Sequence, residues 1–252
     1  MTARPWVTKK TLKWLIFVAS AAVLLAQTVP AGSRRTTFPL LEGTRLEIEG
    51  CTIEGRADGP SIYLVAGLHG DETAGWRAAG RLRELRLSAG KLWIVSPANR
   101  YGAAEGKRKT AEERDINRNF PGDRDGCDAE RIAAALYEDI EKKKPDLVLD
   151  LHEAETENGS KDDLGNSLIC LSIETTGDLV LDLMTASQQG QIGSGPLTLY
   201  GSPPPGSINR VVTEALGIPV ITVETSREEP LERRIENHLE IVGYILDYYG
   251  LP

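Results

Sequence analysis

Two of the three histidines in this chain lie beside carboxylates in patterns typical of metal ligands. His69 and Glu72 are three residues apart in AGLHGDETAG, directly after the apolar run IYLVA. His152 follows the run DLVLDL, and Glu224 ends the run IPVITV. Two imidazoles and one carboxylate form the three-ligand shell of a catalytic zinc ion, which leaves a fourth position for water. Zinc in such a shell polarises a carbonyl while a nearby carboxylate takes and returns a proton.

Each of these residues also has an ordinary structural interpretation. The H-x-x-E spacing is frequent in turns, His152 alone suits a hydrogen-bonded strand end, and Glu224 alone suits a helix cap. A metal site is favoured because all of them fall at the carboxyl ends of expected strands, where open α/β sheets place their sites. Between the two ligands of the first motif, Gly70 would allow a tight turn and Asp71 would orient a histidine. The third histidine, His238, is expected on the solvated face of a helix.

The elements that must position these residues alternate between strand and helix patterns. Apolar runs predict strands at 46–55, 61–67, 91–99, 146–152, 166–172 and 218–225. Helical periodicity covers 73–87, 128–144, 178–189, 207–216 and 231–249. The segment 100–125 has little periodicity and is expected to be a long functional loop. The alternation predicts one α/β domain of three α/β/α layers around a mixed, mainly parallel sheet.

The first 31 residues have the pattern of an export signal. Four basic residues at positions 4, 9, 10 and 13 precede the apolar run WLIFVASAAVLLA, and small residues follow at Val29-x-Ala31. We therefore expect a signal peptide or membrane anchor at 1–31, a linker at 32–44 and a catalytic domain at 45–252. The protein is then expected in the periplasm or outside the cell, released or tethered to the membrane through its N-terminal segment.

The overall composition argues against several other classes of protein. The formal charge is −8, from 29 basic and 37 acidic residues, and no basic stripe with interleaved aromatics is present, so nucleic acid is not an expected partner. The three cysteines, Cys51, Cys127 and Cys170, have neither zinc-site nor disulfide spacing. No G-x-S-x-G sequence is present, which argues against a serine nucleophile.

The expected loop carries groups that suit an anionic substrate. Its sequence EGKRKTAEERDINRNFPGD contains an arginine beside an asparagine, Arg118 and Asn117. An arginine fork pairs well with a carboxylate through charge-assisted hydrogen bonds. A solvated charged loop is the alternative interpretation, against which the specific NRNFPG turn argues.

The motifs HGDE, RDINRNFPG, DLH and a strand-end glutamate, in that order, resemble the zinc carboxypeptidase superfamily. The resemblance spans roughly residues 60 to 230. Within the superfamily, FPGDRDGCDAERIAAALYEDI leading to PDLVLDLH is most similar to the succinylglutamate desuccinylase/aspartoacylase branch. The fold that the resemblance implies is the carboxypeptidase-like α/β/α domain.

The resemblance also implies roles for single residues. One zinc ion per chain would be bound by His69, Glu72 and His152, with Glu224 as general base and acid. Asn117 and Arg118 match the two residues with which family members bind the terminal carboxylate of their substrate. Two arginines, Arg108 and Arg114, compete for the position that stabilises the oxyanion, and Arg108 lies where peptidoglycan-cleaving members carry theirs. Tyr200, upstream of the glutamate, matches the substrate-contacting tyrosine of carboxypeptidases, with a packing aromatic as the alternative.

The function that this implies is a zinc hydrolase that cuts an amide bond near a free carboxylate. A metallocarboxypeptidase acting on small peptides or cell-wall stem peptides is favoured by the export pattern. The alternative is an N-acyl amino acid deacylase of the branch named above. A non-catalytic zinc-binding module of the same fold is the remaining hypothesis.

Overall fold

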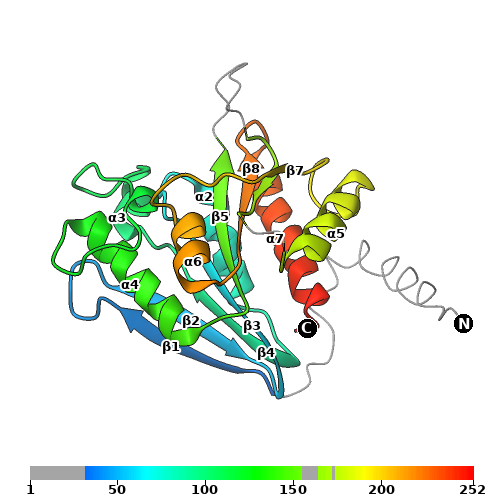
Figure 1. Ribbon diagram of the computed structural model, residues 1–252, viewed down its shortest axis with the longest axis horizontal. Helices are drawn as coiled ribbons and strands as arrows, with labels where there is room; N and C mark the ends of the chain where they lie inside the picture. The colour runs from blue at the N-terminus through cyan, green and yellow to red at the C-terminus, as the bar shows by residue number, and fades with distance from the viewer. Residues whose placement is uncertain (1–31, 155–163, 172–173) are drawn as a thin grey trace, which may run out of the picture. The chain divides into compact units, whose positions relative to one another are not determined.

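The computed structural model describes residues 32–154, 164–171 and 174–252, and the expected export signal at 1–31 lies outside the described residues. Gly32–Pro252 forms one compact unit built on an eight-stranded sheet. In sequence order the strands are β1 (Arg34–Leu40), β2 (Ile48–Glu54), β3 (Ala57–Ala66), β4 (Ala89–Val95), β5 (Leu147–Ala154), β6 (Ser167–Ile169), β7 (Thr198–Tyr200) and β8 (Val220–Ser226). Their spatial order is β1-β2-β4-β3-β5-β8-β6-β7 (Figure 1).

The centre of the sheet is parallel and its margins contain the antiparallel pairs. Strands β4, β3, β5 and β8 run parallel to one another, and β6 runs parallel to β7. The pairs β1–β2, β2–β4 and β6–β8 are antiparallel. The prediction of a mixed, mainly parallel sheet is therefore confirmed.

Helices cover both faces of this sheet (Figure 1). On one face, side chains of α2, α5 and α7 join the core, and on the other those of α4 and α6 do so. The helices are α2 (Thr73–Leu82), α3 (Arg100–Glu105), α4 (Asp128–Lys143), α5 (Gly177–Gln188), α6 (Ile208–Leu216) and α7 (Leu231–Tyr248). Successive side chains of β3 point to opposite faces of the sheet, so this strand contributes to both cores. Ile62 and Leu64 pack on the first face, and Tyr63 and Val65 pack on the second. Burial on both faces explains why this strand is a continuous apolar run.

Three expectations about local structure were wrong. The segment 32–44, expected to be a linker, contains β1, an edge strand whose residues are mostly exposed and so give no apolar alternation. The helix expected to reach residue 87 ends at Leu82, and the chain then turns so that Leu87 is buried in the core. The expected loop 100–125 includes α3 and the short 3₁₀ helix η1 (Ile116–Arg118).

Within the described ranges, the helices are too short or too polar to cross a membrane. The expected anchor at 1–31 is not among those residues, so the membrane tether stays a prediction.

Candidate metal centre

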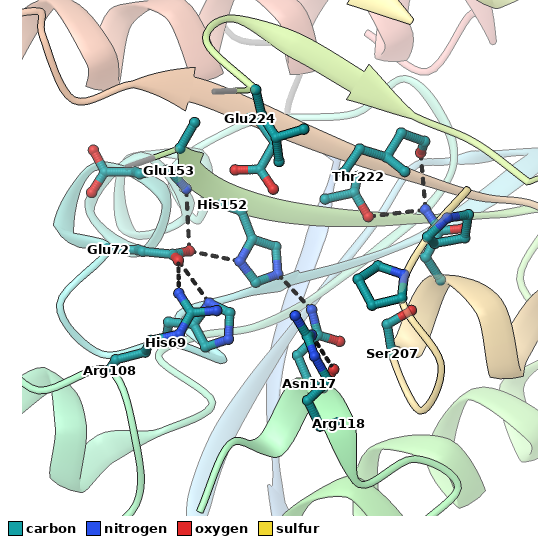
Figure 2. A pocket seen from close by; sticks show the side chains of 16 residues that line it. His69, Glu72, Arg108, Asn117, Arg118, His152, Glu153, Ser207, Thr222 and Glu224 are labelled. Atoms are coloured by element: carbon teal, nitrogen blue, oxygen red, sulfur yellow. Dashed lines mark hydrogen bonds and ion pairs between the residues drawn. The ribbon is translucent and has the colours of Figure 1, made fainter. Parts of the chain in front are cut away.

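The residues of the predicted zinc shell lie together at one edge of the sheet. Strands β3, β5 and β8 are parallel neighbours, so their carboxyl ends meet there. His69 lies in the loop after β3, Glu72 is the N-cap residue of α2, and His152 belongs to β5. Figure 2 shows the carboxylate of Glu72 between the two imidazoles.

The geometry of these three side chains suits a single metal ion. His69 Nδ1 lies 2.7 Å from Glu72 Oε1, and His152 Nδ1 lies 2.6 Å from Glu72 Oε2. One donor atom from each of the three residues falls within 4.8 Å of the others. All three residues are buried, and across the described ranges this is the one group of three such residues close enough to share a metal. The donor set of two imidazoles and a carboxylate matches catalytic zinc sites.

The far nitrogen of each imidazole faces a second carboxylate. His69 Nε2 lies 3.1 Å from Asp115 Oδ1, and His152 Nε2 lies 2.8 Å from Asp150 Oδ2. A carboxylate in this position fixes the proton on Nε2 and turns the Nδ1 lone pair toward the metal position. The structure therefore fits a bound metal beyond the three ligands themselves.

Asp115 and Asp150 were not predicted, although the sequence holds a signal for one of them. Asp150 precedes His152 by two residues on a strand, which places both side chains on the same face. Asp115 lies in the RDINRN segment, where nothing in the sequence distinguishes it from its charged neighbours.

Of the two residues between His69 and Glu72, Gly70 lies in the expected turn, in which the Glu72 amide donates to the His69 carbonyl at 3.4 Å, whereas the role expected for Asp71 was wrong. Among the described residues Asp71 makes no hydrogen bond to a histidine, and its carboxylate instead accepts one from Arg227 at 3.1 Å. Gly70 has no left-handed backbone, but a Cβ there would overlap the backbone of Gly102 and Ala103. Glycine is required at this position because the loop packs directly on α3.

Glu72 is held in place from several sides. The backbone amide of Glu153 donates to its Oε2 at 3.1 Å, and Arg108 Nη1 donates to its Oε1 at 3.0 Å. Burial opposes the charged form, but the imidazoles of His69 and His152 outweigh it and hold the pKa of Glu72 well below its usual range. Glu72 therefore stays ionised, as a metal ligand must be.

Glu153, the carboxylate next to His152, has a structural role. Its side chain points to the opposite face of the sheet, where Oε2 accepts a hydrogen bond from the Ala74 amide at 3.1 Å. Its other oxygen pairs with Arg234. The carboxylate thus binds the positive N-terminal end of α2 and holds this helix against β5.

Glu224 faces the metal position from β8. It is paired in register with His152 and is 7% exposed, and its side chain makes no hydrogen bond within the described part of the chain. Burial raises the pKa of Glu224 to about 7, with the nearby carboxylates of Glu72 and Asp150 adding to the effect against the charge of His152. A carboxyl group with this pKa can exchange a proton near neutral pH.

Asn117 and Arg118, the residues expected to bind the substrate carboxylate, lie on the other side of the cavity. Asn117 belongs to η1, and its Oδ1 accepts a hydrogen bond from the Ile208 amide at 2.9 Å. This bond fixes the amide so that Nδ2 lies 3.2 Å from His152 Nε2. The exposed Arg118 follows, with one guanidinium nitrogen donating to the Asn117 carbonyl at 2.7 Å. Both residues line a cavity of about 260 Å³ together with the metal ligands and Glu224 (Figure 2).

The structure separates the two arginines that compete for the oxyanion position. Arg108 lines the cavity and contacts Glu72, whereas Arg114 is exposed and is not part of the cavity wall. Tyr200 lies at the end of β7, and it too is absent from the described wall.

The expectation for His238 was wrong. Its side chain is fully buried between α7 and the sheet, with Nε2 3.1 Å from Thr225 Oγ1. Burial lowers the pKa of His238 to about 3, and the charge of His152 acts in the same direction. His238 is therefore a neutral core residue that packs behind the site.

The fold and the site together define a class: an α/β/α domain with a His₂Glu group and a buried carboxylic acid at the carboxyl edge of its parallel strands. The chain belongs to the succinylglutamate desuccinylase/aspartoacylase catalytic domain family, whose model matches residues 58–247. This family assignment confirms the resemblance noted in the sequence.

One curated relative is similar to part of this chain, and two solved structures share its fold. N-alpha-acetyl-L-2,4-diaminobutyric acid deacetylase of Halomonas elongata is 37% identical over 106 residues, which are 40% of this chain and 30% of the relative. A succinylglutamate desuccinylase from a Silicibacter species superposes with a TM-score of 0.66 at 19% identity, covering 90% of this chain and 70% of that one. The product-bound cell shape determinant protein Csd4 of Helicobacter pylori gives a TM-score of 0.69 at 19% identity, covering 81% and 56%. The chain thus spans less than a third of the length of the curated relative.

Proposed function

We propose that this protein is a zinc-dependent hydrolase that cleaves an amide bond next to a free carboxylate. The observation that carries the proposal is the convergence of His69, Glu72 and His152 on one point, with Glu224 facing it from the next strand. Membership of the succinylglutamate desuccinylase/aspartoacylase family supports it.

Each side chain of the site has its own role in the proposed hydrolysis. His69, Glu72 and His152 would hold zinc, which would supply a Lewis acid for the amide carbonyl and would acidify the attacking water. Glu224 takes the proton from that water and returns it to the leaving amine, a task for which its raised pKa suits it. Arg108 lies beside the metal position and stabilises the negative charge that develops on the carbonyl oxygen. Asn117 and Arg118 bind the substrate carboxylate and so align the scissile bond.

N-acyl amino acids are the substrate class best supported by the relatives. The matched family and the Halomonas elongata relative are both named for removal of an acyl group from an amino acid. Peptidase action, which the sequence favoured, uses the same chemistry, and the fold of Csd4 accommodates a bound tripeptide. Both classes of substrate present an amide near a free carboxylate.

A substrate panel tests this proposal on zinc-loaded protein. The panel compares N-acetyl and N-succinyl amino acids, dipeptides and stem-peptide fragments, each with a free and with an amidated carboxylate. We expect turnover of N-acyl amino acids, lost on chelation and strongly reduced for the amidated forms. Turnover of peptides alone would replace the deacylase by the carboxypeptidase. Stoichiometric zinc without turnover of any member would favour the non-catalytic module.

We also propose that the protein acts outside the cytoplasm, on the strength of the basic and apolar pattern in residues 1–31. Cell fractionation of the full chain, with mass spectrometry of its N-terminus, tests this. A mature N-terminus near residue 32 in the exported fraction is expected, whereas an intact chain in the cytoplasm would contradict the proposal.

A further inference from the structure

The carboxyl group of the proposed general base, Glu224, has no hydrogen-bond partner in the described part of the chain. Figure 2 shows it facing the cavity, with no contact drawn to the other side chains of the wall. A group that takes and returns a proton at a fixed place needs neighbours that hold its side chain in one orientation. The residues around Glu224 on the sheet are the ones that could do this.

The strand next to β8 places Ser167 directly opposite Glu224. Ser167 is the first residue of β6, and it pairs with Glu224 in the antiparallel register of β6 and β8. The Cα atoms of directly opposite residues in an antiparallel pair are about 4.5–5.5 Å apart. The hydroxyl of a serine and the longer side chain of a glutamate can meet across this separation.

Ser167 and Glu224 also project from the same face of the sheet. The neighbouring pair of the register, Leu168 and Val223, packs in the core on the opposite face. Because side chains alternate along a strand, Ser167 shares its face with Ile169, which lines the cavity together with Glu224. The serine hydroxyl therefore lies on the cavity side of the sheet, beside the general base.

The hydroxyl of Ser167 is itself buried and unpaired. The residue is fully buried, and its Oγ has no hydrogen-bond partner among the described residues. A buried polar group without a partner costs free energy, and native structures keep few of them. Two polar side chains that each lack a partner thus face each other across one pair of strands.

The other polar side chains on this face of β6 and β8 already have partners. The Oδ1 of Asn166 accepts a hydrogen bond from the Ser226 amide at 3.0 Å, and its Nδ2 donates to a carboxylate of the following loop. Thr222 Oγ1 accepts from Asn209 at 3.0 Å, and Ser226 Oγ accepts from the Glu228 amide at 3.4 Å. On these two strands, which the structure describes completely, the hydroxyl opposite the general base is the one that is still uncommitted.

A hydroxyl matches the chemical task of a proton-transferring carboxyl group. An ionised carboxylate only accepts hydrogen bonds, whereas the protonated acid also donates one. A serine hydroxyl has one donor and two acceptor positions, so it can donate to the carboxylate and accept from the acid. An ammonium group in its place could only donate, and it would favour the ionised form alone.

We propose that Ser167 is a positioning residue, whose hydroxyl hydrogen-bonds to the carboxyl group of Glu224 in both of its protonation states. This inference rests on the proposed function, in which Glu224 moves the proton. The register of β6 and β8 fixes the two backbones, so rotation of the side chains between staggered positions forms the bond. The bond keeps the carboxyl group directed at the metal position while the proton is taken up and returned.

Removal of the hydroxyl tests this role by kinetics on zinc-loaded protein, with the N-acyl amino acid that the wild type turns over fastest. Ser167→Ala should lower kcat about 10- to 100-fold, the range for a hydrogen bond to a charged group, with KM and zinc content unchanged. Ser167→Thr retains a hydroxyl and should keep most of kcat. Ser96→Ala is the matched control, because Ser96 is also buried with an unpaired Oγ but follows β4, and it should keep wild-type kinetics. Unchanged kcat in Ser167→Ala would refute the proposal.

A double-mutant cycle separates positioning from a general effect on the cavity. If Ser167 acts through Glu224, Ser167→Ala should cause no further loss of the residual rate in a Glu224→Gln background. A change in cavity shape would lower the rate by the same factor in both backgrounds. That second result would overturn the positioning role.

Crystal structures of the zinc-loaded wild type and of Ser167→Ala give a measurement that needs no turnover. We expect Ser167 Oγ about 2.7 Å from a carboxyl oxygen of Glu224 in the wild type, and a displaced Glu224 carboxyl group in the variant. A separation beyond about 3.5 Å in the zinc-loaded wild type would refute the proposal even if hydrolysis is observed. The bond in a protein that turns over no substrate would support the positioning of Glu224 and would contradict the proposed hydrolase instead.

Discussion

His152 and Glu224 are directly paired residues of the parallel strands β5 and β8. Paired residues of neighbouring strands project to the same face, so this pairing points a metal ligand and a carboxylic acid toward one space (Figure 2). Both strands are buried on both faces, which fixes their register. The distance between His152 and the base is thus set by the sheet rather than by a loop.

The first prediction follows from this pairing. Glu224→Gln keeps the size of the side chain but removes the base, so zinc content should be unchanged and kcat should fall about 10²–10⁴-fold. Metal analysis and kinetics on the same preparation measure both. Glu228→Gln, an exposed glutamate four residues on, is the matched control and should behave like the wild type. A Glu224→Gln variant with full turnover would show that another group moves the proton.

The sequence was sufficient to predict the centre of this arrangement. The apolar runs that end at His152 and Glu224 form central strands, and buried parallel strands have few alternative registers. Local patterns therefore determined where those side chains project. The family resemblance supplied the pairing between residues far apart in the chain.

Features that depend on long-range packing could not be predicted in this way. His238 has polar neighbours in the sequence, and only the packing of α7 on the sheet shows that it is buried. Apart from the family resemblance, which favoured Arg108, the sequence does not separate Arg108 from Arg114, and the path of the loop decides which of them reaches the cavity. Asn209 gave no signal, because its hydrogen bonds are evident only once Ile169 and Thr222 are in place.

The carboxylate behind His152 yields a second prediction. Asp150→Asn weakens the group that holds the proton on His152 Nε2, so the imidazole is less firmly oriented toward the metal. We expect zinc affinity to fall about 10- to 100-fold, as measured by competition with a chelator. Asp146→Asn changes the residue directly before the same strand, whose carboxylate accepts hydrogen bonds from Ser61, and it should leave the affinity unchanged. Unaltered affinity in Asp150→Asn would mean that packing alone orients His152.

The two arginines yield a third prediction. Arg108→Ala should lower kcat/KM about 10²–10³-fold, because a positive charge next to the developing oxyanion is lost. Arg114→Ala changes the same residue type six positions along and outside the cavity wall, and it should retain wild-type kinetics. The reverse result would assign the oxyanion role to Arg114 and would require the loop to rearrange when substrate binds.

The buried His238 yields the last prediction, on stability against pH. Its folded-state pKa of about 3 lies below the ordinary value of 6.5, so the unfolded chain binds a proton that the folded protein does not. The folded state therefore keeps its full stability above pH 6.5 and loses stability as the pH falls from 6.5 toward 3. At pH 5 the loss from this group is about 2 kcal/mol in the free energy of unfolding. His238→Gln does not titrate, so urea unfolding at pH 7.5 and pH 5 should show a smaller decline for the variant. The same decline in both proteins would show that His238 is protonated in the folded state.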